Sequence, residues 1–163
     1  MSRPLKWGEL ELPIRADTII PVSDSLSVRG PLRACDLPGI MGEDDWFDAY
    51  RYALTEFVGY WNHSEDPGSL IADPPSYEGD DWRLLPTIAS FVHALADRKG
   101  FPVPNWVREH VAPQDWVVFC DPPESYLWKH SLEKAPRACA DHRVYFHPRL
   151  LDRGTQNWWL PWN

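Results

Sequence analysis

Apolar residues in the stretch 80–106 recur at the spacing of an α-helix. At intervals of three and four residues, one face of that helix would carry Leu84, Leu85, Ile88, Phe91, Val92 and Leu95. Arg98 and Lys99 precede Gly100. Cations followed by glycine are typical of a helix C-terminus, because cations favour the last carbonyl groups and glycine readily adopts a left-handed conformation. The pattern therefore predicts an amphipathic helix that ends at Gly100.

A second helix is predicted from Glu43. Its broad apolar and aromatic face consists of Trp46, Phe47, Tyr50, Leu54, Phe57, Val58 and Trp61. The acidic residues 43–45 suit a helix N-terminus, where the helix dipole favours negative charge. The stretch 62–67 ends this helix, and residues 69–80 (SLIADPPSYEGD) form a turn-rich connector, since two consecutive prolines prevent a helix from continuing.

Shorter elements are predicted in the second half of the chain. They are a short helix over 106–110, an apolar run over 116–119, a helix over 125–135, an extended piece over 144–146 and one helical turn over 148–152. In the helix over 125–135, we expect Leu127, Trp128 and Leu132 to face inward.

The two ends of the chain lack a helical pattern. Residues 1–42 are expected to form an extended N-terminal arm, because Pro13 and Pro21 interrupt their longest apolar stretch. Residues 155–163 form an aromatic tail that is too apolar to remain in water. The expected fold class is mainly α: a single irregular helical domain over 43–154, with an extended N-terminal arm, a short strand near the C-terminus and a docked aromatic tail.

The charge of the chain limits the partners it can bind. The net charge is −8, and the first 81 residues carry 6 Lys/Arg against 16 Asp/Glu. Such a chain lacks the cations that neutralise phosphates, so we expect no direct binding to nucleic acid, whereas a basic partner protein would be attracted. The sequence has no run of 18 apolar residues and no apolar signal core, so we expect no membrane contact and a cytoplasmic location.

No combination of residues predicts an active site by itself. The segment from Arg137 to His142 fits the Arg-x4-His pattern of HEPN ribonucleases, in which histidine acts as general acid or base and arginine holds the phosphate. However, Pro136 precedes the segment and an extended run follows, so a long helix is not expected there. Cys139 and His142 have metal-like spacing, but no second close pair completes a set of four ligands. We therefore expect no metal, no cofactor and no small-molecule substrate.

Residues 45–154 resemble a bacterial domain that follows Xre-type helix-turn-helix modules in antitoxin-like regulators. These regulators are encoded beside nucleotidyltransferase toxins, as in MenA/MenT pairs. The matching positions are the Leu/Ala-rich helix Leu84 to Ala96, Pro104-Asn105-Trp106, Asp115-Trp116, Ala135-Pro136, Arg143 to Phe146 and Leu151-Asp152-Arg153. The connector 71–75 (IADPP) is similar to the family's acidic-proline step before the helix. This sequence shows no helix-turn-helix pattern, so the resemblance implies the part that holds a partner protein.

The resemblance implies an antitoxin rather than an enzyme. It would neutralise a cognate nucleotidyltransferase toxin by blocking the active site, and its acidic residues would compete with phosphates for the toxin's basic groove. The residues expected to contact the toxin are Glu43, Asp44, Asp45, Asp48, Trp158, Trp159 and Trp162. The alternatives are a HEPN-like RNase that uses Arg137 and His142, and an accessory or immunity protein.

Deleting residues 157–163 tests the role of the aromatic tail. If the tail is an interface with the toxin, the truncated protein keeps its melting temperature and loses toxin binding. Interface tryptophans often contribute about 2 kcal/mol or more, which is roughly 30-fold in affinity. Thermal denaturation and co-purification with the toxin measure the two quantities. A lower melting temperature would show instead that the tail covers the core, and would remove its tryptophans from the interface.

Overall fold

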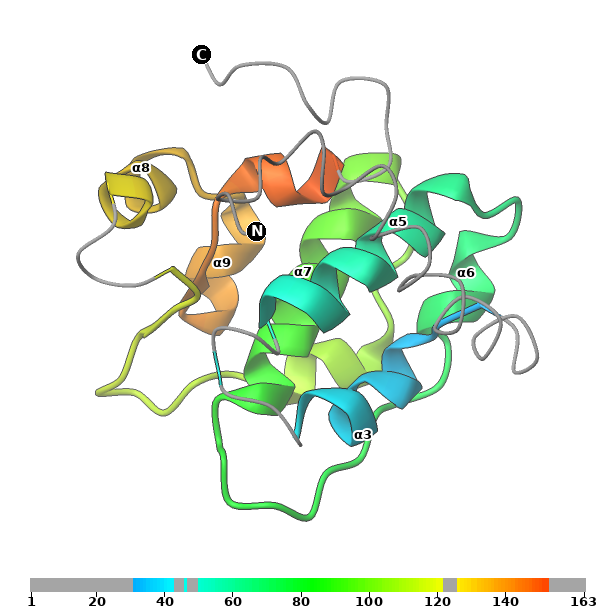
Figure 1. The fold of residues 1–163 in the computed structure, drawn as a ribbon, viewed down its shortest axis with the longest axis horizontal. Coiled ribbons are helices and arrows are strands. Elements are labelled where there is room, and N and C mark those ends of the chain that lie inside the picture. Colours follow the sequence, from blue (N-terminus) through cyan, green and yellow to red (C-terminus); the bar gives the residue numbers. More distant parts are fainter. Residues whose placement is uncertain (1–30, 43–45, 47–49, 122–125, 153–163) are drawn as a thin grey trace, which may run out of the picture. The chain divides into compact units, whose positions relative to one another are not determined.

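The computed structural model describes residues 31–42, 46, 50–121 and 126–152, and within these residues the fold is mainly helical (Figure 1). The α-helices are α3 (Leu37–Met41), α5 (Thr55–His63), α6 (Pro67–Ile71), α7 (Leu84–Lys99), α8 (Tyr126–Lys134) and α9 (Arg137–His142). The other helical segments are the 3₁₀ helices η2 (Ala34–Asp36), η4 (Asn105–Glu109) and η5 (Pro148–Asp152) and the π-helix η3 (Tyr50–Leu54). The mainly α fold class predicted from the sequence is confirmed. None of the helices just named is long and apolar enough to cross a membrane.

Helix α7 is the central element, and it packs against α3, η4, α9, β2 and η5. Figure 1 shows α9 on one side of it. Every residue from Pro86 to Ala96 is buried, so α7 has no solvent-exposed face over these residues. The predicted helix is confirmed, and its polar residues Thr87, Ser90 and His93 are buried like the apolar ones. The side away from the large apolar residues carries small ones, such as Ala89 and Ser90, and neighbouring segments can therefore pack on it closely.

Both ends of α7 follow from local chemistry. The helix begins at Leu84, and Pro86 lies in the first turn, where a missing backbone N–H breaks no helical hydrogen bond. At the other end, Gly100 has a φ of 73°, and its N–H bonds to the carbonyl groups of Ala96 and Asp97. The predicted stop at Gly100 is confirmed.

The second predicted helix is present as α5 and the π-helix η3, which precedes it. Its predicted beginning at residues 43–45 lies outside the described residues. The apolar face that the sequence predicts is buried at Trp46, Leu54, Phe57, Val58 and Trp61. Helix α5 ends at His63, as predicted. Trp61 also contacts the ring of Phe101, which connects α5 to the end of α7.

Residues 34–41, which the sequence predicts to be part of an extended arm, are helical in η2 and α3. Pro38 is compatible with a helix because it lies in the first turn of α3. Leu37 and Met41, four residues apart, are both buried in the core. The prediction was wrong here because Pro38-Gly39, a pair common in turns, lies inside the helical segment. The rest of the predicted arm, residues 1–30, lies outside the described residues.

Two other predictions are also wrong. The start of the predicted connector, residues 69–71, belongs to helix α6, whose Leu70 and Ile71 are buried. In α8, Leu132 is 49% exposed, while its neighbour Ser131 is buried and donates a hydrogen bond to Asp121. A buried polar pair therefore holds this part of α8, in place of the predicted leucine contact. The side chains of Leu127 and Trp128 lie outside the described residues.

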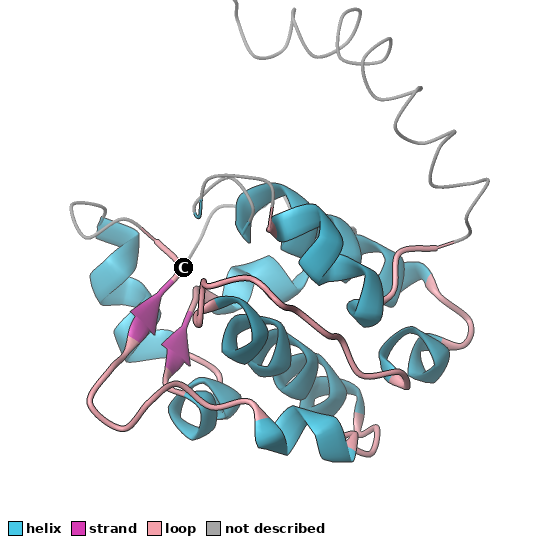
Figure 2. Ribbon diagram, turned by 90° about the horizontal axis from the view of Figure 1, so that it is seen from below, coloured by secondary structure: helices cyan, strands magenta, loops and turns pink. Residues whose placement is uncertain are grey.

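Two short strands, β1 (Val118–Phe119) and β2 (Val144–Tyr145), pair in parallel. Figure 2 shows them side by side. Val118 lies opposite Val144 and Phe119 opposite Tyr145, and helices α8 and α9 form the crossover that a parallel pair requires. The predicted extended piece over 144–146 is confirmed, whereas the apolar run over 116–119 pairs only at its last two residues.

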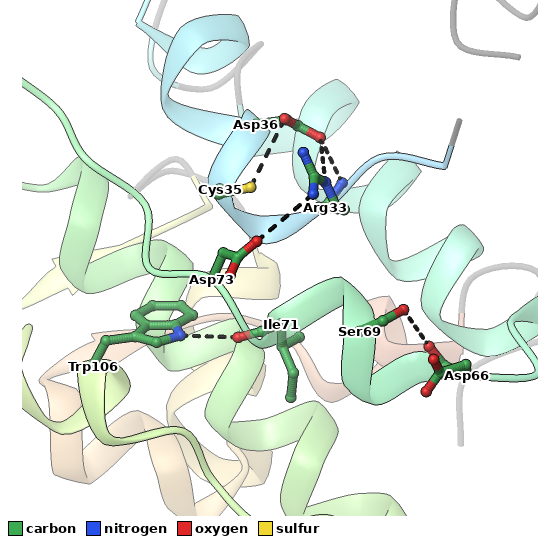
Figure 3. Close-up of polar contacts among 8 residues, drawn as sticks. All are labelled: Arg33, Cys35, Asp36, Asp66, Ser69, Ile71, Asp73 and Trp106. Atoms are coloured by element: carbon green, nitrogen blue, oxygen red, sulfur yellow. Dashed lines mark hydrogen bonds and ion pairs between the residues drawn. The ribbon is translucent and has the colours of Figure 1, made fainter. Parts of the chain in front are cut away.

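Trp106 joins two segments that are distant in the sequence. It is 6% exposed, and its indole N–H donates a hydrogen bond of 2.9 Å to the carbonyl oxygen of Ile71 (Figure 3). Asp73, two residues further on, forms an ion pair of 3.7 Å with Arg33, which also pairs with Asp36. Trp106 and the connector 71–75 are both positions of the family resemblance, and here they contact each other.

We expect Trp106→Phe to lower the free energy of unfolding by about 1–3 kcal/mol, because the buried carbonyl of Ile71 loses its hydrogen-bond donor. Trp116→Phe is the matched control, since that ring is exposed and the change should stay within about 0.5 kcal/mol. Urea denaturation measures both values. Equal effects of the two substitutions would contradict a structural role for the Trp106 hydrogen bond.

Candidate functional site

All seven residues that are predicted from the sequence to contact the toxin lie outside the described residues. They are Glu43, Asp44, Asp45, Asp48, Trp158, Trp159 and Trp162. The aromatic tail, residues 155–163, lies outside them as well. Their role in binding a partner stays a prediction, and the candidate site must be built from other side chains.

Two tryptophans that the sequence does not connect form an exposed pair. Trp82 precedes α7 and is 42% exposed, and Trp116 precedes β1 and is 59% exposed. Their ring centroids are 5.7 Å apart at an angle of 56°. Val111, which is 38% exposed, lines the same cleft as Trp82. We call Trp82, Val111 and Trp116 the tryptophan surface.

A cleft of about 330 Å³ adjoins the tryptophan surface. Three segments form it: the end of the connector, the first turn of α7 and the loop after η4. The lining residues are Tyr77, Gly79, Asp80, Asp81, Trp82, Leu85, Pro86, Glu109, His110, Val111 and Pro113. The cleft is therefore apolar and aromatic, with three carboxylates among its lining side chains.

One of these carboxylates is already paired. Arg83 holds Asp81 through two hydrogen bonds of 2.8 Å, and these bonds lower the pKa of the Asp81 carboxyl below its usual value. The guanidinium of Arg83 also lies 4.3 Å from the ring centroid of Trp46. In contrast, Asp80 and Glu109 are exposed, and neither forms an ion pair with any described residue. Two negative charges at the cleft thus remain available to a partner.

The loop that lines one part of the cleft is fixed by a buried histidine pair. The ring of His142 is 1% exposed, and its Nδ1 lies 2.6 Å from the carbonyl oxygen of His110. A carbonyl only accepts, so His142 donates from Nδ1, and its Nε2 accepts the hydrogen bond of 2.9 Å from Nδ1 of His93. Burial lowers the pKa of His142, which keeps the ring neutral in this arrangement.

Two further hydrogen bonds connect the end of α9 to the same loop. The N–H of Ala112 donates to the carbonyl of His142 over 3.0 Å, and the guanidinium of Arg143 donates to the carbonyl of Ala112 over 2.6 Å. Arg143 adopts a φ of 58°, which is unusual for a residue other than glycine. These contacts hold Val111, which lies between His110 and Ala112, at the tryptophan surface.

The proposed ribonuclease pair is not brought together in an accessible site. Arg137 is exposed at the first position of α9, whereas His142 is buried at the last and both its ring nitrogens are hydrogen-bonded. Cys139 is buried too, and burial raises the pKa of its thiol to about 11. Among the described residues, no group of three or more His, Cys, Asp and Glu side chains could hold a metal ion.

A second histidine pair lies between α8 and the end of β2. The rings of His130 and His147 stack with centroids 4.6 Å apart, and Nδ1 of His147 accepts a hydrogen bond from the backbone N–H of Arg149. Burial is the main cause that lowers the pKa of His147 to about 4, and the neighbouring His130 and Arg149 lower it further. His147 is therefore neutral in the folded protein.

No protein-family model matches this chain, and no curated protein or solved structure is significantly similar to it. The resemblance to antitoxin-like regulators therefore depends on the residues quoted for it, and the function is argued from those residues and the geometry of the site.

The buried histidines predict that acid destabilises the fold. An unfolded histidine has a pKa of about 6.5, so the unfolded chain binds protons that neutral His142 and His147 do not. Stability is fully present above about pH 6.5 and decreases as the pH falls towards about 4. We expect His147 alone to account for about 2 kcal/mol between about pH 7.5 and about pH 5, measured by urea denaturation.

The substitution His147→Asn keeps an acceptor for the Arg149 N–H and removes the titrating ring, so it should reduce this pH dependence. His63→Asn serves as the control, since His63 is exposed and should leave the pH dependence unchanged. If His147→Asn loses as much stability between about pH 7.5 and about pH 5 as the unsubstituted chain does, His147 is not a cause of the pH dependence.

Proposed function

We propose that this chain is an antitoxin that binds a nucleotidyltransferase toxin in the cytoplasm and neutralises it by blocking its active site. In this proposal the chain performs no chemistry itself. Its role is to present a surface that matches the toxin in shape and charge. The tryptophan surface with its adjoining cleft is the observation that carries the proposal.

Exposed tryptophans of this kind are typical of protein interfaces. Tryptophan combines a large apolar area with a polar N–H, and it is enriched among the residues that dominate binding energy. Two indoles in contact with each other, 42% and 59% exposed, expose more apolar surface than isolated side chains would. A partner that covers them would remove this area from water, which favours association.

The two tryptophans of the family resemblance, Trp106 and Trp116, have different roles in this fold. Trp106 is buried and bonded to Ile71, so its role in this chain is to hold the fold. Trp116 is mostly exposed and pairs with Trp82, so its ring is accessible to a partner. This division supports a protein-binding role for the second tryptophan of the pattern.

Charge supports the same kind of partner. A nucleotidyltransferase binds nucleotide phosphates, and its substrate groove is therefore expected to be basic. The exposed carboxylates of Asp80 and Glu109, beside the tryptophan surface, would be attracted to such a groove and would compete there with phosphates. The net charge of −8 would speed the encounter.

The geometry does not favour the RNase alternative. A general acid or base must reach within hydrogen-bond distance of its substrate, and His142 is 1% exposed with both ring nitrogens engaged. Its contacts with His93 and the loop at His110 explain its presence without catalysis. The structure offers no observation that specifically favours an accessory or immunity protein.

The product of the neighbouring reading frame is the natural binding partner to test. We expect it to be a nucleotidyltransferase that arrests growth, and co-expression of this chain should restore growth. The substitutions Trp82→Ala and Trp116→Ala should each weaken binding by about 30-fold, as the loss of interface tryptophans commonly does. Isothermal titration calorimetry on the purified pair measures the affinity.

Tyr52→Ala is the matched control, because Tyr52 is 63% exposed and lies outside the tryptophan surface and its cleft. It should bind the toxin as the unsubstituted chain does. If the two tryptophan variants also bind with unchanged affinity, this surface is not the interface. If co-expression does not restore growth, the antitoxin proposal itself is wrong.

A further inference from the structure

The cleft beside Trp82 has the features of a site for one cationic side chain. Its volume of about 330 Å³ lies at the small end of ligand pockets, which span roughly 300–1,000 Å³. It brings an exposed indole together with the carboxylates of Asp80 and Glu109. Aromatic rings and carboxylates both attract cations, and a guanidinium can use the two at once.

The chain already contains this combination next to the cleft. The guanidinium of Arg83 lies over the ring of Trp46 and binds Asp81 through two hydrogen bonds. Tryptophan, arginine and carboxylate thus form a small stack within the protein. Trp82, one residue from Arg83, has the aromatic and acidic parts of a second such stack, with Asp80 and Glu109 as the carboxylates.

No lining residue supplies the missing guanidinium. Among the residues that line the cleft, only His110 can become positively charged, and its imidazole cannot present the planar fork of an arginine. Arg83 is already held by Asp81, and Arg143 is held by the carbonyl of Ala112 and does not line the cleft. A guanidinium in the cleft would therefore come from a residue that does not line it, and a basic partner protein can supply one.

We infer that the cleft binds an arginine side chain of the partner protein. Its guanidinium stacks on the indole of Trp82 and donates hydrogen bonds to Asp80 and Glu109, while Tyr77 and Leu85 contact its aliphatic stem. Arginine suits the site better than lysine, because its planar group can stack and bind a carboxylate through two donors together. This inference rests on the proposed function of the surface as the toxin interface.

The probe is N-acetyl-L-argininamide, titrated into the full chain labelled with ¹⁵N and observed through the tryptophan indole N–H signals. We expect saturable shifts of the Trp82 and Trp116 signals, with a dissociation constant of about 1–10 mM for a single side chain. N-acetyl-L-citrullinamide has nearly the same shape without the charge, and it should cause no saturable shift. The absence of saturable shifts up to about 100 mM argininamide, or equal binding of the citrulline compound, would overturn the inference.

A pair of double variants locates the site. Asp80→Asn combined with Glu109→Gln should weaken argininamide binding about tenfold or more, since both carboxylates are lost. The control is Glu78→Gln combined with Asp115→Asn, which removes two exposed carboxylates that do not line the cleft. The control should change the dissociation constant less than about twofold. Equal losses in the two double variants would show that only the overall charge matters, and would overturn the inference.

The same variants separate this inference from the proposed function. If Trp116→Ala abolishes toxin binding while Asp80→Asn with Glu109→Gln leaves it unchanged, the interface stands and the arginine site is wrong. If argininamide binds as expected and the neighbouring nucleotidyltransferase does not, the arginine site stands and the antitoxin proposal is wrong.

Discussion

The burial of helix α7 from Pro86 to Ala96 determines the rest of the structure. Water cannot reach its middle turns, so polar side chains there must bond to the segments that pack around them. Ser90 donates to the carbonyl of Val144 in β2 over 3.3 Å, and His93 donates to His142 at the end of α9. Each bond satisfies a buried group and also fixes a neighbouring element. Thr87 is the exception, because its hydroxyl has no hydrogen-bond partner among the described residues.

Two buried rings of the core, those of His142 and Trp106, form hydrogen bonds with segments that lead to the cleft. His142 donates to the carbonyl of His110, which holds the end of η4 at Glu109 and the loop that carries Val111. Trp106 donates to the carbonyl of Ile71, which holds the end of α6, where the connector to Trp82 begins. Both contacts are buried hydrogen bonds from a ring nitrogen to a backbone carbonyl. The exposed site is thus built on loops, and the core restrains those loops at both sides.

What could be predicted from the sequence is what depends on local chemistry. The extent of α7 follows from apolar spacing and from Gly100, and the end of α5 follows from the polar stretch after Trp61. The helices over 34–41 and 67–71 were missed, because each contains a Pro-Gly pair, which is a common turn signal.

The candidate site could not be predicted, because it depends on contacts between distant residues. Trp82 and Trp116 are 34 positions apart, and only the packing of β1 beside β2 and the loop after η4 brings them together. No spacing rule connects two such residues. For the Arg-x4-His pattern, in contrast, the sequence suggested a site that the fold does not make accessible. Its spacing is present, but the burial of His142, which decides whether the ring can reach a substrate, is a property of the fold.

The hydrogen bonds that fix the loops around the cleft also affect its affinity for a partner. A partner that binds a mobile loop must first order it, and that entropy reduces the affinity gained from contacts. Here Val111 lies between two hydrogen-bonded residues, and Trp82 is followed directly by Arg83, which is fixed by Asp81 and by the ring of Trp46. The contact residues are thus held before the partner arrives. Exposed carboxylates beside the two indoles keep this apolar surface hydrated in the free protein, and they add attraction once a basic partner approaches.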